Sequence, residues 1–285
     1  MRFIRVLVPL ALIAAALAIS DPQGVIERLA GISLGWLFLS FVLLTLVIVL
    51  SALRWRVTAV ALGLPLTIRE AVQEYYLSQF INQTVPGGIL GDAARAVRSR
   101  QGGPLKRSAQ AVVLERASGQ VAMAAILAVA LAVTLVAPQA VLPGSDRLPD
   151  FIWLPVLVLV IIVLAVGGLA FLRVQAGGWG EAVRIALIGR LAAQTVLSLA
   201  VALLTLAAFV IAARATGTWL PPAAAMLIVP LILTAMLLPA SVAGWGWREG
   251  AAAALLPIAG SDAASGVAAS IAFGLAVFVS TLPGA

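Results

Sequence analysis

The sequence predicts an all-α fold, a polytopic membrane helix bundle in which two segments are broken by proline and glycine. The 285 residues are 63% hydrophobic and only 10% charged, whereas soluble domains are about half apolar and a quarter charged. Apolar runs of roughly the 20 residues that cross about 30 Å of hydrocarbon recur along the chain. Two polar, glycine-rich stretches interrupt this pattern and direct attention to a site inside the membrane.

Five to seven segments meet or approach spanning length. The first, 3–19, follows Arg2 and Arg5 and resembles both a cleaved signal peptide and an uncleaved first helix. We expect the uncleaved helix, since more spans follow. The other expected helices are 32–53, 108–136, 151–172, 185–213, 222–238, 249–257 and 266–282.

A weaker helix is expected over 68–82. It carries too many polar groups for exposure to lipid, so it is re-entrant, interfacial or buried against other helices. The polar residues are Arg69, Glu70, Gln73, Glu74, Tyr75, Tyr76, Gln79 and Asn82. For Tyr75 and Tyr76 we expect helix packing rather than a head-group cage.

Each half of the chain contains the pattern P-x4-G-x3-R. Irregular backbone at membrane depth needs protein or water to satisfy its amides, so such breaks usually line a cavity. The simpler interpretation is two kinked helices with arginines at the membrane boundaries. The breaks comprise Pro86, Gly87, Gly88 and Gly91 in the first motif (68–95), and Pro239, Gly244 and Gly246 in the second (222–250). Both belong to a single integral membrane domain, 1–285.

Basic residues between the apolar runs predict the orientation, because cytoplasmic loops are enriched in Lys and Arg. If the first broken segment dips into the bilayer and returns, most bases lie on one side, so the N terminus is expected in the cytoplasm. The second break is then entered from the outer face, as in an inverted repeat. The bases on the cytoplasmic side are Arg2, Arg5, Arg54, Arg56, Arg69, Arg95, Arg98, Arg100, Lys106, Arg107, Arg173, Arg184 and Arg190.

Composition also excludes several kinds of chemistry. The chain has no Cys and no His, so it lacks a disulfide framework, thiolate or imidazole metal ligands and the usual nucleophile and base pairs. It has no P-loop motif. We therefore expect no enzyme activity, no cofactor and no metal. The net charge of +7 is divided among short loop clusters, which is typical of membrane topology rather than nucleic-acid binding.

The remaining polar residues are candidates for contact with a lipid head group. An arginine can bind a phosphate bidentately, and free amides at a helix break favour anions. Nearby acids either bind a cationic part of the head group or hold the arginines when lipid is absent. The candidates are Asn82, Asp92, Arg95, Glu115, Arg116, Ser241, Arg248 and Glu249.

Structural alternatives exist for these candidates. Asp92 and Arg95 are spaced for a local ion pair at a helix N-terminus. Glu115 and Arg116 point about 100° apart, so at least one should face the interior. Trp245 and Trp247 are equally suited to anchoring at the interface and to contacting lipid tails, and the pair Arg54 and Trp55 is suited to the membrane interface.

These motifs, in this order, resemble the flippase-like family that includes the transmembrane domain of lysylphosphatidylglycerol synthase. The resemblance runs from about Ile32 to the end and covers Arg54-Trp55, Asn82, Pro86-Gly87, Gly91-Asp92-x-x-Arg95, Glu115-Arg116-x-x-Gly119 and Pro239-x-Ser241-x-x-Gly244-x-Gly246-x-Arg248-Glu249. It implies a domain that moves a phospholipid between leaflets. Nothing resembles the soluble synthase domain, so lipid synthesis is not expected. The abrupt end leaves open a missing last segment.

The resemblance implies a multi-pass protein of the cell (inner) membrane. Its expected partners are membrane lipids, with an anionic or aminoacylated phospholipid as the first choice. A homo-oligomer or a separate lipid-modifying enzyme is a further expected partner. Two other function classes stay open. One is a non-transporting subunit of a lipid-modifying or glycosyltransfer complex. The other is a head-group transferase, which a single aspartate without an acidic cluster disfavours because phosphoryl transfer normally needs Mg²⁺.

Overall fold

The computed structural model describes residues 20–85, 88–100, 103–142, 178–237 and 243–285, together with three positions of the N-terminal segment, 11, 14 and 18. The expected span 151–172 therefore lies outside the described residues, and so does all of 3–19 except those three positions. So do Pro86, Gly87, Pro239 and Ser241 of the two breaks.

The described part of the chain contains helices joined by turns and no strands, which confirms the predicted all-α membrane bundle. Four of its helical stretches are long and apolar enough to cross a membrane: Leu34–Ala61, Leu105–Val136, Trp179–Ala215 and Ala263–Gly284. Within them lie the long helices α3 (Leu34–Ala61), α6 (Leu105–Val136), α10 (Leu191–Ala215) and α13 (Ala263–Thr281). At 1.5 Å per residue, α6 is about 48 Å long.

Two short helical hairpins separate these long helices. The first consists of α4 (Ile68–Thr84) and α5 (Leu90–Arg98), and the second of α11 (Pro222–Thr234) and α12 (Trp247–Leu255). At roughly 13 to 26 Å, none of the four helices is long enough to cross the hydrocarbon alone. Helix α11 continues as a 3₁₀ turn, Ala235–Leu237, so the expected single run 222–238 changes helix type before it ends.

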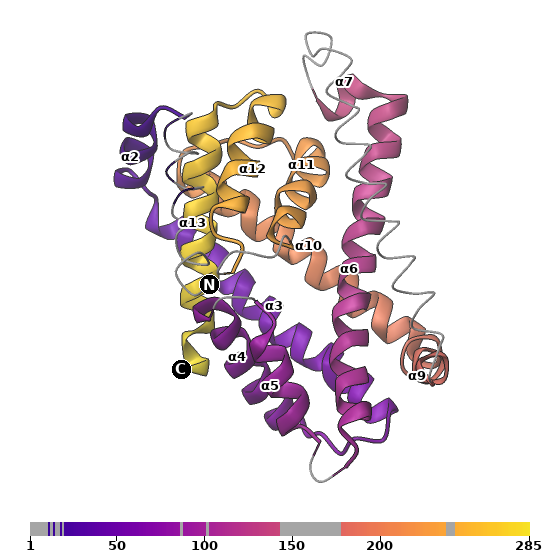
Figure 1. The fold of residues 1–285 in the computed structure, drawn as a ribbon. Coiled ribbons are helices and arrows are strands. Elements are labelled where there is room, and N and C mark those ends of the chain that lie inside the picture. The colour runs from indigo at the N-terminus through magenta and orange to yellow at the C-terminus, as the bar shows by residue number, and fades with distance from the viewer. Residues whose placement is uncertain are drawn as a thin grey trace.

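The hairpins enter the bundle from opposite ends (Figure 1). At one end, which we call the α9 end, α9 (Trp179–Ala186) packs beside α3 and the start of α6. The first hairpin connects α3 to α6 there. At the other end, the α2 end, α2 (Pro22–Ala30) packs on α13. The second hairpin connects α10 to α13 at that end. The re-entrant path through a membrane and the repeat symmetry stay predictions.

Local sequence accounts for where the hairpins and their neighbours begin. Thr67 accepts a hydrogen bond from the Glu70 amide while the Glu70 carboxylate accepts one from the Thr67 amide, a capping box that starts α4. Asp262 caps α13 by accepting from the Ser265 amide at 2.6 Å. Pro222 occupies the first turn of α11, where its missing N–H has no effect on helix bonding.

Each hairpin packs into its own hydrophobic core. Around the first hairpin, buried side chains of α3, α4, α5, α6 and α9 surround Trp55 and Tyr75. Around the second, side chains of α6, α10, α11, α12 and α13 surround Phe209 and Phe273, whose ring centroids are 5.3 Å apart. Helix α6 contributes to both cores and α13 contacts both hairpins, so these helices join the two halves.

Candidate functional site

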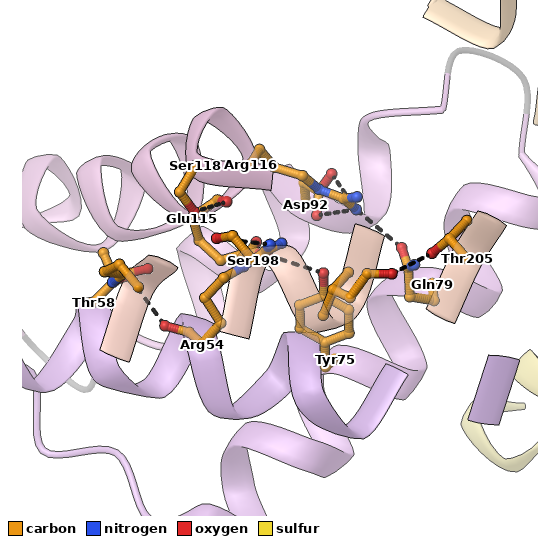
Figure 2. A network of polar contacts seen from close by, with 12 residues as sticks. Arg54, Thr58, Tyr75, Gln79, Asp92, Glu115, Arg116, Ser118, Ser198 and Thr205 are labelled. Carbon is orange, nitrogen blue, oxygen red and sulfur yellow. Dashed lines mark hydrogen bonds and ion pairs between the residues drawn. The ribbon is translucent and has the colours of Figure 1, made fainter. Parts of the chain in front are cut away.

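Five charged side chains meet where α3, α5 and α6 converge beside α4, and we call them the first charge cluster. They are Arg54, Asp92, Arg95, Glu115 and Arg116. Figure 2 shows most of them pointing toward one another from separate helices. The apolar helices α3 and α6 and the short polar helix α5 thus contribute charge to one small volume.

Glu115 is the centre of the cluster and is fully buried. Its Oε1 accepts from Arg54 Nη2 at 2.6 Å and from the Tyr75 hydroxyl at 3.2 Å, and its Oε2 accepts from Arg95 Nη2 at 3.2 Å. A buried carboxylate is tolerated only when it is paired and hydrogen-bonded in this way. Glu115 therefore ties α6 to α3, α4 and α5 at once.

Asp92 forms the outer part of the cluster, with 14% of its side chain exposed. It accepts from Arg95 Nη2 at 2.9 Å, from Arg116 Nη2 at 2.9 and 3.0 Å, from the Ser78 hydroxyl at 3.2 Å and from Asn82 Nδ2 at 3.3 Å. Arg116 also donates to Gln79 Oε1 at 2.9 Å. Its side chain is 38% exposed, so Arg116 is the member most open to the surroundings.

Arg95 is held by two aromatic rings in addition to its two carboxylate partners. Its guanidinium carbon lies 4.5 Å from the Trp55 ring centroid and 4.4 Å from that of Tyr75, and the side chain is fully buried. Its Nε and Nη1 make no hydrogen bond within the part of the chain that the structure describes. Stacking between two rings stabilises the cation where hydrogen-bond acceptors are missing.

The first charge cluster carries a net charge of +1, since three guanidinium groups face two carboxylates. Removing charge from water is costly and each unbalanced charge raises the cost. The cluster is therefore poised to accept one more anion, and Arg116 is the side chain best placed to meet it.

The second hairpin holds a smaller group, the second charge cluster, formed by Arg248, Glu249 and Ser270. Glu249 Oε1 accepts from Arg248 Nη2 at 2.7 Å and from the Ser270 hydroxyl at 2.9 Å, while its Oε2 accepts from the Gly246 amide at 2.6 Å. Arg248 Nε also donates to Ser270 at 2.9 Å. Both charged side chains are buried.

The two arginines of the repeated motif have corresponding environments. Arg248 lies 4.9 Å from the Trp245 ring centroid and 5.6 Å from that of Phe273, as Arg95 lies between two rings. Each arginine is buried, stacked on aromatics and paired with an acid. The two motif arginines thus resemble each other in burial, ring contacts and acidic partner as well as in sequence position.

Glycines make room for these contacts. A Cβ on Gly91 would meet the backbone of Ser78, so glycine allows α5 to approach α4 closely. A Cβ on Gly119 would lie 3.0 Å from the Arg54 guanidinium, and one on Gly274 would collide with Arg248. At Gly244 and Gly246, φ angles of +80° and +87° favour glycine directly.

The structure thus places the predicted site residues in two groups rather than one. Asn82, Asp92, Arg95, Glu115 and Arg116 lie at the first hairpin, and Arg248 and Glu249 at the second; Ser241 lies outside the described residues. Within the described residues no hydrogen bond or ion pair joins the two groups. The local Asp92–Arg95 pair that the spacing suggested is present, and Arg95 also reaches Glu115.

Arg54 and Trp55 have partners inside the bundle that the sequence pattern does not show. They were expected at the membrane interface, but both are buried, and Arg54 is the closest partner of Glu115. Arg54 lies seven residues before the end of α3 at Ala61, whereas the expected helix 32–53 places this charge at a helix end. Tyr75 packs as expected but also donates to Glu115, and Trp245 stacks on Arg248 rather than standing free as an anchor. Ser270 was not singled out.

Fold and site together define a multi-pass, α-helical membrane protein with charged residues buried inside the bundle. The family model described as the lysylphosphatidylglycerol synthase TM region matches residues 4–284. The chain therefore belongs to this family, which supports a role connected with membrane lipids. A search of curated proteins finds no match to the chain.

Proposed function

We propose that this protein moves a phospholipid, or another lipid-linked head group, between the leaflets of the cell membrane. The first charge cluster is the observation that carries the proposal. It places three arginines and two acidic residues inside a helix bundle, one basic residue in excess, and leaves Arg116 partly exposed. A lipid phosphate is an anion that such a site would accept.

Crossing hydrocarbon is costly for a head group, because an isolated charge there costs several kcal/mol. A transporter lowers this cost by offering polar partners along the route. The phosphate would compete with Asp92 for Arg116, and the Asp92 oxygen released from Arg116 would then be available to a cationic group such as an aminoacyl amine, while Arg95 still pairs with Asp92. An anionic or aminoacylated phospholipid is therefore the substrate that we propose.

The two charge clusters suit the two halves of such a route. The first belongs to the hairpin at the α9 end and the second to the hairpin at the α2 end. With the α9 end in the cytoplasm, the hairpins would be re-entrant segments of an inverted repeat, with their tips directed toward the midplane. Transport would run downhill or be coupled to an ion or proton gradient.

Reconstitution in liposomes tests the proposal. Fluorescent phosphatidylglycerol in the inner leaflet should become accessible to an impermeant quencher faster with protein than without it. Arg116→Gln should slow this exchange about tenfold or more, since a charge-assisted hydrogen bond contributes about 1.5–3 kcal/mol. Arg98→Gln is the matched control, because Arg98 forms an exposed ion pair with Glu74 outside the cluster.

Absence of exchange by folded wild-type protein would contradict transport. That result would favour the other membrane role, a non-transporting subunit of a lipid-modifying or glycosyltransfer complex.

A further inference from the structure

The strongest feature that the proposed function leaves unused is Gln120, a polar side chain exposed on the spanning helix α6. It is the sixteenth of the 32 residues of α6, so about 22 Å of helix precede it and about 24 Å follow it. The hydrocarbon layer is about 30 Å thick. Wherever that layer falls along the helix, Gln120 lies inside it.

An amide at this depth needs a polar partner, since hydrocarbon satisfies neither its N–H nor its carbonyl group. The Gln120 side chain makes no hydrogen bond to any described residue, and it is exposed rather than packed away. Its neighbour Val121, 69% exposed, is the kind of side chain that a lipid-facing surface usually carries. Gln120 is therefore a poor residue for contact with acyl chains.

The position of Gln120 suggests what satisfies it. It follows Arg116 by four residues, so the two side chains lie on the same face of α6, one turn apart. Arg116 is the partly exposed member of the first charge cluster and binds Gln79 and Asp92 of the first hairpin. A polar strip thus leads from the cluster along α6 toward the middle of the bilayer.

We propose that Gln120 lines a water-filled vestibule, open to the side, through which a phosphate-bearing head group reaches Arg116. Its amide would donate to phosphate or glycerol oxygens and accept from water when no lipid is present. This deepens the proposed function by naming where the head group enters and which group recognises it. The recognition of a head group rests on the proposed function. The access of water to Gln120 does not depend on it.

The absence of cysteine from the chain allows a direct test on the full-length protein. Gln120→Cys and Val121→Cys each introduce one thiol at the same depth, pointing about 100° apart around the helix. A charged, water-soluble thiol reagent reacts with the thiolate, which forms only where water reaches the sulfur. In phosphatidylcholine nanodiscs, Gln120→Cys should react about tenfold faster than Val121→Cys.

Titration after denaturation in detergent gives the total thiol and shows that both variants carry one reactive group. Equal rates in the folded proteins, whether fast or slow, would overturn the vestibule.

The ligand is tested by protection of Gln120→Cys. Phosphatidylglycerol in the nanodiscs should slow labelling, and inorganic phosphate alone should do so less or not at all, because it lacks the lipid that holds the head group at this depth. Phosphate protecting while phosphatidylglycerol does not, or protection by neither, would overturn the head-group assignment.

The two proposals fail separately. Labelling and protection without lipid exchange in liposomes would contradict transport and leave the vestibule standing. Lipid exchange in liposomes together with an unreactive Gln120→Cys would contradict the vestibule and leave transport standing.

Discussion

Glu115 shows how a single residue can connect several helices. It accepts hydrogen bonds from groups on α3, α4 and α5 within the bundle core. Removing one partner of a buried ion pair is costly because the opposite charge stays buried without compensation. Stability and site geometry are therefore coupled at this position.

Glu115→Gln should lower the free energy of unfolding by about 3–5 kcal/mol, because Arg54 and Arg95 lose their shared carboxylate. The measurement is unfolding of the purified protein in mixed micelles with increasing denaturing detergent. Glu74→Gln is the control, since its partly exposed pair with Arg98 should contribute at most about 1 kcal/mol. Equal losses for the two variants would show that Glu115 does not organise the cluster.

Gly274 is a second residue at which a neighbouring side chain limits substitution, because Arg248 leaves no room for a Cβ atom. Gly274→Ala would drive a methyl group into Arg248 and toward Trp245, and overpacking of this kind costs about 1–3 kcal/mol. Gly250→Ala, also in a helix but with open space at its Cβ, should be neutral or stabilise by up to about 1 kcal/mol. The same unfolding assay compares them, and a harmless Gly274→Ala would contradict the close contact.

At the scale of elements, the short helices are held in place by caps and by contacts with long helices. Helix α2 is joined to α13 by an ion pair in which Arg28 Nη2 lies 2.8 Å from Asp262 Oδ2. Asp262 also caps α13 through Ser265. One exposed carboxylate thus links an end helix to the start of a spanning helix.

The pH dependence of this link follows from Asp262. Partial burial opposes its charged form, but hydrogen bonds from Ser265 and the charge of Arg28 outweigh burial and lower the pKa of Asp262. A carboxylate with a lowered pKa stabilises the fold above its unfolded pKa of about 3.9 and loses that effect as pH falls through the folded value. Hydrogen exchange of α2 amides, corrected for intrinsic rates, should show constant protection above about pH 5 and a loss below about pH 3.9.

Asp262→Asn serves as the control for this prediction. It should reduce the protection of α2 at neutral pH and make it insensitive to pH over the same range. If the protection of the α2 amides depends on pH in the variant as it does in the wild-type protein, groups other than Asp262 cause the loss of protection at low pH.

At the scale of the whole molecule, the two hairpins bear on which helix ends lie on the same side of the membrane. Because the helices of each hairpin are too short to cross the bilayer, we expect α3 to end on the side where α6 begins, and α10 on the side where α13 begins. Positive charge concentrated at the α9 end then predicts that this end faces the cytoplasm.

Single cysteines in the cysteine-free chain test this topology. Arg100→Cys at the α9 end and Glu27→Cys at the α2 end, both exposed positions, should be labelled by an impermeant reagent from opposite sides of sealed membrane vesicles. In vesicles of native orientation, Glu27→Cys should react from the outer side and Arg100→Cys only after the vesicles are inverted or opened. Labelling of both from one side would contradict the hairpin path.

The sequence by itself determined the class of protein and, within the described residues, the four long apolar helices, because hydropathy and length act locally along the chain. It also identified Asp92, Arg95, Glu115, Arg116, Arg248 and Glu249, since charge in a hydrocarbon-rich segment is conspicuous.

Only the tertiary structure decided which charges meet. Arg54 and Trp55 look like interface residues in sequence, yet they lie beside Glu115 and Arg95 because α3 packs against the first hairpin and α6. The division of the candidates into two clusters is likewise a result of helix packing. Which charges compensate one another depends on distances of a few ångströms between helices far apart in sequence, and local pattern carries no information about those distances.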